Sequence, residues 1–460
     1  MNRKISWFIL ALVAVLFVFA GSAFYCNCEN QPIQDNTQKV IGAHKNKPNI
    51  RRVNIRFSEG TSKRVKEKFF KKMGLVPIEY NVFGYDIAEA RNSQRAANID
   101  IPKEFEKMAL TLPTEDISYV YVESYEKEEL KKTRTSPLRR RAHRKKLIVP
   151  WYDRRNQYSI QLNDAHNFIK EQRIPLSPNG VVVVDDGPEF LHDDIRPSLR
   201  YNLRQPYFWV SNRNRRSYYT GDHGTHVSCL AAGHRDGQGV EGVAAPHSYI
   251  LPLIVNYNDF GFYFASDIAR GLKHYRKLER KGKITFRAVN MSFMMFFESK
   301  VVLSAIKRMK RKIFVVAAGN EKIDMDTKPK MYPAGWRLPN IVAVAAYGES
   351  GKLSHFSNYG RENVDIAAPG QKVPSCVIGN KYESWDGTSM ASPLVAGTVS
   401  LLFSIDPDAS VRRIKNVLFF GSSSNRFLQG KVKNARQLNV NAAVRHLRFI
   451  MEWRLWFIMD

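Results

Sequence analysis

The chain has 460 residues, which is too long for one compact domain, so we expect two folded units with additional segments. Its hydrophobic share of 44% and charged share of 25% are ordinary for a globular protein. The formal net charge of +28 would suit acidic substrates, anionic membranes or nucleic acid, but a solvated basic surface explains it more simply. Because no RNA-recognition, zinc-finger or basic-zipper pattern is present, no nucleic-acid partner is expected.

The N-terminus has the pattern of a secretory signal. Arg3 and Lys4 precede an apolar run from Ile5 to about Ala20, and small residues follow up to Ala23. Residues 1–23 are therefore interpreted as a signal peptide, although the run is also long enough for an uncleaved membrane anchor. We expect a secreted protein, extracellular or in the lumen of the secretory pathway, which contacts a membrane only if this segment is retained.

The next part of the chain has a small α+β pattern. Residues 24–50 are polar and mixed, and are interpreted as a disordered lead-in to a unit at 51–125. Within that unit the pattern predicts a strand at 53–60, a basic amphipathic helix at 61–73, a strand at 82–90, a short helix at 102–110 and an edge strand at 117–124.

A strongly basic segment follows at 126–146. More than half of residues 131–146 are Lys or Arg, so the segment cannot bury itself and is predicted to be an exposed linker. It offers cleavage sites after Arg141 and Lys146, which favours proteolytic processing between two folded units. A solvated tether or an anion-binding patch remains the alternative.

From residue 147 to 444 the pattern becomes α/β. Continuous apolar stretches that are rich in β-branched residues alternate with helical stretches at 266–280 and 301–310, which indicates a largely parallel sheet covered on both faces. The predicted strands are 181–186, 249–255, 286–293, 312–318 and 341–347. Residues 445–460 are basic and aromatic, and either an appended helix or an exposed tail would explain them.

Reactive side chains stand at strand ends and helix starts in this second unit. Asp185 ends the apolar run at 181–184, His223 precedes a small-residue helix, and Ser389 opens another helix. Each alone has an ordinary explanation, namely a turn, a helix cap and an N-cap. Together they supply an acid, a base and a nucleophile in the chain order Asp, His, Ser. Asn320 follows a further strand and offers an amide to an oxyanion.

These blocks resemble a known family. Asp-Asp-Gly, His-Gly-Thr-His, Ala-Ala-Gly-Asn and Gly-Thr-Ser-Met-Ala-Ser-Pro are similar to the four signature segments of subtilisin-like serine proteases, and the resemblance extends over about 147–443. It implies a doubly wound, mostly parallel sheet, preceded by a small α+β pro-domain at 51–125 that inhibits the enzyme. It also implies that Ser389 is the nucleophile, His223 the general base, Asp185 its partner and Asn320 an oxyanion donor.

The same resemblance implies a substrate cleft lined by Gly261, Ser292, Phe293 and Gly319. The sequence departs from the family pattern here, because Met294, Met295 and Tyr263 stand where glycines are expected. Such bulk would narrow the cleft. The expected function is therefore a serine endopeptidase made as a zymogen, and the alternative is a weak or inactive binding protein with the same fold.

Cofactors and partners are also expectations of the resemblance. Asp194 and Asp236 align with a calcium site, although a surface turn with a capping Asp would explain them as well. No organic cofactor is expected. Proteins or peptides are the expected substrates, the pro-domain is the expected inhibitor, and the protein is expected to be a monomer. Cys229 and Cys376 could form a disulfide or remain two buried thiols.

Overall fold

The computed structural model describes residues 51–57, 62–72, 75–90, 114–120, 146–154, 156–199, 201–202, 205–206, 209–210, 221–255, 265–295, 298–327 and 331–459. The predicted signal, the lead-in and almost all of the basic linker lie outside the described residues. The chain divides into two compact units, of which the smaller belongs to the N-terminal part and the larger contains the α/β region.

The smaller unit is a four-stranded sheet with one helix. Its strand order is β2-β3-β1-β4, and the bounds are β1 Arg51–Phe57, β2 Leu75–Val82, β3 Tyr85–Ala90, β4 Thr114–Val120 and α3 Lys63–Lys72. The helix is joined to the sheet by an ion pair between Lys66 and the buried Asp86, at 2.8 Å. The predicted helix at 102–110 lies outside the described residues.

One prediction for this unit is wrong. Residues 82–90 do not form a single strand, because β2 ends at Val82 and β3 begins at Tyr85 after a tight turn. Phe83 and Gly84 make that turn with φ of +51° and +96°. The sequence pattern missed β2 because its residues mix apolar, polar and proline positions, and so do not alternate clearly.

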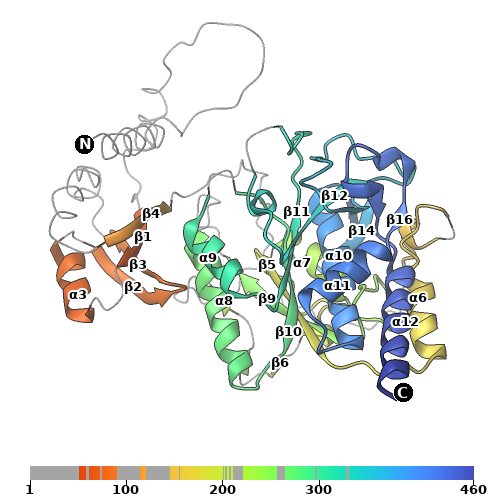
Figure 1. The fold of residues 1–460 in the computed structure, drawn as a ribbon, viewed down its shortest axis with the longest axis horizontal. Coiled ribbons are helices and arrows are strands. Elements are labelled where there is room, and N and C mark those ends of the chain that lie inside the picture. The colour runs from red at the N-terminus through yellow and green to blue at the C-terminus, as the bar shows by residue number, and fades with distance from the viewer. Residues whose placement is uncertain are drawn as a thin grey trace, which may run out of the picture. The chain divides into compact units, whose positions relative to one another are not determined.

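The larger unit is built on a nine-stranded sheet, whose order is β16-β17-β13-β12-β11-β10-β5-β9-β8 (Figure 1). Neighbours from β8 to β17 pair in parallel, and only β16 pairs antiparallel with β17. The central strands are β5 Asn179–Asp185, β9 Ser248–Ile254, β10 Phe286–Met291, β11 Ile313–Ala317, β12 Ile341–Tyr347 and β13 Ile366–Pro369. The edge strands are β8 Trp209–Val210, β16 Ser423–Ser424 and β17 Arg436–Gln437.

Burial explains the composition of these strands. All residues of β5, β9, β10, β11 and β12 are buried, so both faces of the sheet favour Val, Ile and Ala over an alternating pattern. The predicted parallel α/β sheet is confirmed. The chain passes from β5 to β9 on one side and later returns to β10 on the other, which makes the end of β5 a topological switch point, where α/β folds place their sites.

Helices cover the two faces of the sheet (Figure 1). Helices α8 Ala265–Arg280 and α9 Lys300–Arg308 pack on one face, while α7 Asp222–Ala232 and α10 Thr388–Ile405 pack together on the other. Helix α10 has the length and hydropathy of a membrane span, but it is almost completely buried among the strands and is a core helix.

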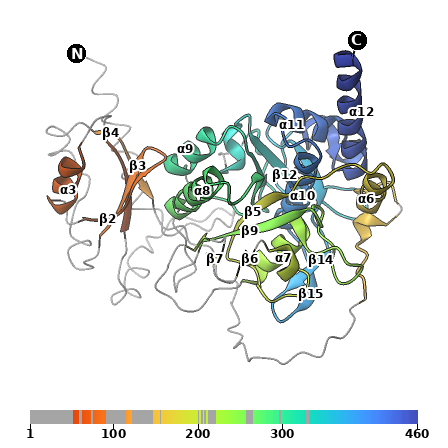
Figure 2. The ribbon, with the colours of Figure 1, turned by 90° about the horizontal axis from the view of Figure 1, so that it is seen from below.

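The C-terminal residues 445–459 are not a separate tail. They continue α12, Val440–Met459, whose first part packs against α6 Leu162–Glu171 and α11 Val411–Phe420 (Figure 2). A small antiparallel hairpin, β14 Val373–Val377 and β15 Lys381–Trp385, leads into α10 and contacts α7.

Candidate active site

Asp185 is the last residue of β5 and is buried, with 5% of its surface exposed. Its Oδ1 accepts two hydrogen bonds, one from His223 Nδ1 at 2.8 Å and one from the backbone N–H of Asp186 at 2.9 Å. Its Oδ2 is also buried and has no hydrogen-bond partner among the described residues. Asp185 is therefore held as the acceptor of the His223 ring.

His223 is the second residue of α7. Because the Asp185 carboxylate can only accept, the ring carries its proton on Nδ1, and Nε2 holds the basic lone pair. The side chain is 35% exposed, so the ring is held on one edge and remains accessible from solvent. This is the tautomer that a general base requires.

Ser389 is the second residue of α10, and hydrogen bonds tie it to the end of β10. Its Oγ donates to Ser292 O at 3.0 Å, while Ser292 Oγ donates back to Ser389 O at 2.8 Å. Beneath them Asn290 Nδ2 donates to Ser292 Oγ at 2.9 Å, and Ser392 Oγ donates to Asn290 Oδ1 at 2.7 Å. This buried network fixes the start of α10 against the sheet.

The orientation of the Asn320 amide is decided by Thr388. Asn320 Oδ1 accepts from both the backbone N–H and the hydroxyl of Thr388, each at 2.9 Å. The Thr388 hydroxyl in turn accepts from Gly319 N at 3.1 Å. With its oxygen held by two donors, Asn320 directs Nδ2 toward the Gly387–Ser389 turn, where it lies 3.6 Å from the ideal Cβ position of Gly387. The amide is thus placed as a hydrogen-bond donor beside Ser389.

Those of the residues predicted to bind substrate that the structure describes lie in different surroundings. Gly261 and Tyr263 lie outside the described residues. Ser292 is buried in the network under Ser389, Phe293 is partly exposed, and Gly319 follows β11 with φ of +106°.

The methionines that replace glycines are both buried. Met294 Sδ lies only 2.8 Å from the position that a Cβ at Gly319 would take, so the side chain packs directly onto this backbone. Met295 pairs through its backbone with Tyr332, with N–H to O distances of 2.6 and 3.0 Å. Met294 therefore occupies space between the ends of β10 and β11.

His226 lies one turn after His223 on α7 and is completely buried. Its ring stacks on Trp385 with centroids 4.7 Å apart, and its Nε2 bonds to Glu383 O at 3.3 Å. Loss of solvation, with a smaller contribution from the charge of His223, lowers the pKa of His226 to about 3. His226 is therefore a neutral packing residue that joins α7 to β15.

Of the two acidic residues predicted to bind calcium, Asp236 lies in the loop after α7, and Asp194 lies in the segment after β5 and bonds to that loop. Asp194 is buried and its Oδ2 accepts from Val240 N at 2.9 Å, whereas Asp236 is exposed and accepts from Gln238 N at 3.0 Å. Burial, and next the charges of Asp194, Asp193 and Asp236, raise the pKa of Tyr382 well above its usual value. Carboxylate oxygens such as those of Asp194 and Asp236 are donors that suit a hard cation such as calcium.

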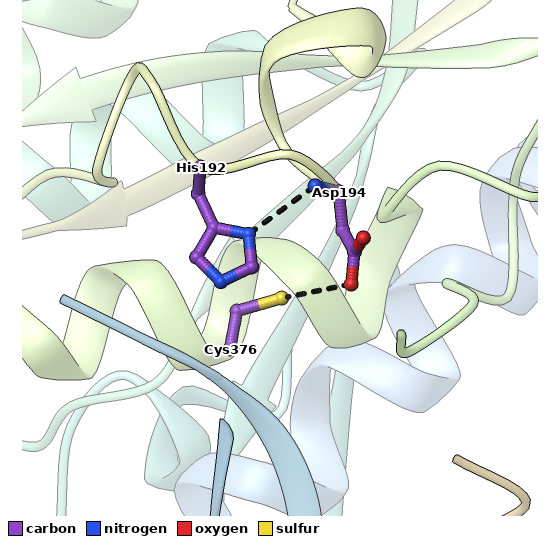
Figure 3. A group of neighbouring side chains, drawn as sticks. All are labelled: His192, Asp194 and Cys376. Atoms are coloured by element: carbon purple, nitrogen blue, oxygen red, sulfur yellow. Dashed lines mark hydrogen bonds between the residues drawn. The ribbon is translucent and has the colours of Figure 1, made fainter. Parts of the chain in front are cut away.

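His192, Asp194 and Cys376 lie close enough to suggest a second kind of metal site (Figure 3). However, both ring nitrogens of His192 are used, Nδ1 by Asp194 N at 3.2 Å and Nε2 by Lys381 O at 3.1 Å. Cys376 forms a disulfide with Cys229, so its sulfur is no thiolate ligand, and the 3.6 Å contact to Asp194 Oδ2 is van der Waals. The cluster does not fit a transition metal.

The disulfide answers a question that the sequence left open. Cys229 of α7 and Cys376 of β14 are 147 residues apart in the chain and are joined in the structure. The bond connects the helix that carries His223 to the hairpin that leads to Ser389.

Comparison with known proteins agrees with this geometry. The sequence model of the subtilase family matches residues 180–437, which is more than half of the chain and contains all four of the reactive side chains described above. The chain belongs to the subtilase family.

Several relatives illustrate the match. Subtilisin-like protease 2 of Plasmodium falciparum is 30% identical over 241 residues, which cover 49% of this chain and 17% of that protein. Subtilisin NAT of Bacillus subtilis subsp. natto is 29% identical over 269 residues, covering 58% of this chain and 65% of the relative. A protease structure from Pseudoalteromonas arctica has a TM-score of 0.53 at 24% identity, covering 65% of this chain and 96% of that one. This subtilase therefore spans less than two thirds of the first relatives that it matches.

Sequence reasoning missed the residues that position the reactive groups. Thr388 was seen only as part of a motif, and Asn290 and Ser392 were not singled out. Their signal was present, since small polar side chains inside fully apolar elements need buried hydrogen-bond partners.

Proposed function

We propose that this subtilase is a serine endopeptidase that cleaves peptide bonds through an acyl-enzyme. The observation that carries the proposal is the 2.8 Å hydrogen bond between His223 Nδ1 and Asp185 Oδ1. Asp185 ends the central strand β5, and Ser389 is the second residue of α10. This bond leaves Nε2 of the His223 ring as the basic nitrogen and places the buried Asp185 carboxylate beside the ring.

The first step is attack by Ser389 on the substrate carbonyl. Its Oγ exchanges the Ser292 carbonyl for His223 Nε2 as hydrogen-bond acceptor and transfers its proton there as the new C–O bond forms. The imidazolium that results is stabilised by the Asp185 carboxylate. Because Asp185 is already placed and buried, little reorganisation accompanies this charge.

The negative oxygen of the tetrahedral intermediate is stabilised by two donors. Asn320 Nδ2 is oriented by Thr388, and the backbone N–H of Ser389 belongs to the first turn of α10, where amides have no intrahelical acceptor. His223 then gives its proton to the leaving amine, and the C–N bond breaks. Water repeats the sequence on the acyl-enzyme and releases Ser389.

A second candidate function rests on Met294. Its packing onto Gly319 fills part of the space where a substrate side chain would enter, so the chain could act as a binding protein with a subtilase fold. We favour the enzyme, since a bulky wall restricts which substrates fit but leaves the reactive groups in place.

Reaction with a fluorophosphonate probe separates the two candidates, because only an activated serine is labelled. We expect the wild-type protein to be labelled and Ser389→Ala not to be. Ser384→Ala, an exposed serine on β15, is the matched control and should be labelled like the wild type. No labelling of folded, processed wild-type protein would leave the binding protein as the better interpretation.

We also infer that the protein is secreted and made as a zymogen inhibited by its N-terminal unit. The support is the signal-like sequence at 1–23, the separate compact unit near 51–120 and the basic segment that follows it. Mass spectrometry of secreted wild-type and Ser389→Ala protein tests this. Autocatalytic cleavage predicts that only the wild type is shortened, near Arg141 or Lys146, whereas a partner protease would shorten both.

For calcium we propose that Asp194 and Asp236 hold the ion at the loop 235–240. Arg235 does not oppose it, because its guanidinium pairs with Glu241 at 3.0 Å. The ion would stabilise the loop and take no part in the reaction. Excess chelator should lower the melting temperature of the wild type by several degrees and change little in Asp236→Asn. Equal melting with and without chelator would contradict this proposal.

A further inference from the structure

Asp186, the residue after the proposed catalytic acid, lies where the end of β5 meets α7. Its backbone N–H donates to Asp185 Oδ1 at 2.9 Å, and its own Oδ1 accepts from Gly224 N at 2.7 Å. Asp185 Oδ2 is buried beside it and has no hydrogen-bond partner among the described residues. A single carboxyl thus contacts both the acid on β5 and the helix that carries His223.

The contact with α7 takes the place of an N-cap. Helix α7 begins after Gly221, which has no side chain to accept from the free amides of the first turn. Asp186 accepts from the third of these amides instead. The fit is close: a Cβ at Gly221 would lie 1.7 Å from Asp186 Oδ2, and a Cβ at Gly224 would lie 2.6 Å from Oδ1. Only glycine fits at both positions while the carboxyl keeps its place.

The contact with Asp185 raises a problem of charge. Two ionised carboxylates on neighbouring residues of a buried site repel one another, and a proton on one of them relieves this repulsion. Asp185 Oδ1 already accepts from two donors, His223 Nδ1 and the backbone N–H of Asp186. Burial, and next the charge of Asp185, raise the pKa of Asp186 well above its usual value.

We propose that Asp186 is a neutral carboxylic acid that donates its proton to Asp185 Oδ2 and accepts from Gly224 N, and so positions Asp185 and His223 together. The proposal explains why Asp185 Oδ2 is buried without any other donor among the described residues. It rests on the proposed function, but assigns Asp186 no contact with substrate. Asp186 is a positioning residue for the Asp185–His223 pair.

Two other acidic groups, at the start of α7 and after β5, face elsewhere. Asp222 Oδ1 accepts from Ile378 N at 2.8 Å, and Glu189 Oε2 accepts from Asn380 N at 2.9 Å, both on the side of the β14–β15 hairpin. The groups whose charge acts on Asp186 are Asp185 and His223. The protonation state of Asp186 is therefore coupled to the catalytic pair itself.

The experiment compares Asp186→Asn with Asp186→Ala in the processed protein, with Asp222→Asn as control for removing one acidic group from the first turn of α7. An Asn side chain reproduces the neutral acid, because its NH₂ donates to Asp185 and its oxygen accepts from Gly224. The rate of fluorophosphonate labelling is measured against pH, since its acidic limb reports the pKa of His223 without need of a substrate.

We expect Asp186→Asn and Asp222→Asn to stay within about threefold of the wild-type labelling rate, with the acidic limb unmoved. We expect Asp186→Ala to lose about tenfold or more, with the limb displaced, because Asp185 loses its donor. Equal losses in Asn and Ala would show that a charged carboxylate is needed and overturn the proposal, as would an Ala variant with wild-type behaviour.

Two further measurements distinguish the positioning role of Asp186 from a role in substrate binding and from failure of the proposed function. If Asp186→Asn raised KM for peptides with Lys or Arg while kcat held, Asp186 would be a substrate-binding residue and the proposal would be wrong. If the wild type were not labelled at all, the proposed function would fail first. The Nδ1 proton resonance of His223 then tests the positioning role by itself: it should persist in Asn and shift or vanish in Ala.

Discussion

Two regions at the ends of neighbouring strands differ in how closely they follow the subtilase pattern. One holds the reactive groups, and the other is the predicted wall of the substrate cleft after β10. Asp185, His223 and Ser389 match the family motifs, and hydrogen bonds at 2.8–3.0 Å hold them. The wall after β10 carries Met294 and Met295 where glycines are expected. The reaction depends on a few atoms at fixed positions, whereas the wall decides which side chains can approach them. Changes in the first region should act on kcat, and changes in the second on selectivity.

Ser389→Ala should have the largest effect. Removing the nucleophile leaves only binding and the oxyanion donors, so peptide hydrolysis should fall by roughly 10⁴-fold or more, a size known from subtilisin itself. The measurement is kcat on any peptide that the wild type cleaves, with circular dichroism to confirm folding. Turnover similar to the wild type would remove Ser389 from the mechanism.

Asn320→Ala should lower kcat by about 10²–10³-fold with little change in KM, again a size taken from subtilisin. The amide acts on charge that develops only in the transition state. Thr388→Val sharpens the comparison, because it removes the hydroxyl that orients Asn320 and keeps the amide; we expect a smaller loss of kcat. A raised KM with unchanged kcat in Asn320→Ala would place this residue in the wall instead.

Met294→Gly should change selectivity more than rate. Opening the space over Gly319 should raise kcat/KM for peptides with a large side chain before the scissile bond by about tenfold, while small side chains gain little. Met291→Leu, at the buried last residue of β10, is the matched control for changing a methionine close to Met294 in the chain. If kcat/KM changed equally for peptides with large and with small side chains, Met294 would not be the residue that limits the space for substrate.

The two histidines of α7 also differ, because one is accessible to solvent and the other is buried. His223 exposes part of its ring, but His226 is buried and its pKa is about 3, against about 6.5 in the unfolded chain. Below pH 6.5 the unfolded chain binds a proton that the folded protein does not, so stability should fall with decreasing pH, by roughly 1 kcal/mol per pH unit from this group. Denaturant unfolding of wild type and His226→Gln between pH 6.5 and 4 checks this; identical slopes would contradict it.

Much of the fold was predictable because its signals are local. The buried strands of the parallel sheet read as unbroken apolar runs, and the helices between them have amphipathic spacing. The hairpin at 82–85 was not predicted, because its turn is short and β2 lacks clear alternation. The helical continuation of α12 also remained open, since basic and aromatic residues suit several structures.

The residues proposed for the reaction could be predicted because each stands in a short motif and the motifs follow a distinctive order. The hydrogen bonds that hold these residues could not be predicted, because they join residues far apart in the chain. Ser292 bonds to Ser389 across 97 residues, and Asn320 bonds to Thr388 across 68. No local pattern shows which polar side chains will meet in the interior.

The sequence by itself determined the family and the parallel α/β architecture, and it predicted which residues are the acid, base, nucleophile and amide. The tertiary structure decided which way the Asn320 amide faces, that Cys229 pairs with Cys376, that Met294 packs onto Gly319, and that Asp186 caps α7 beside Asp185. The physical reason is that motifs arise from neighbours along the chain. Protonation, amide orientation and pocket shape instead depend on atoms that folding brings within about 3–4 Å of one another.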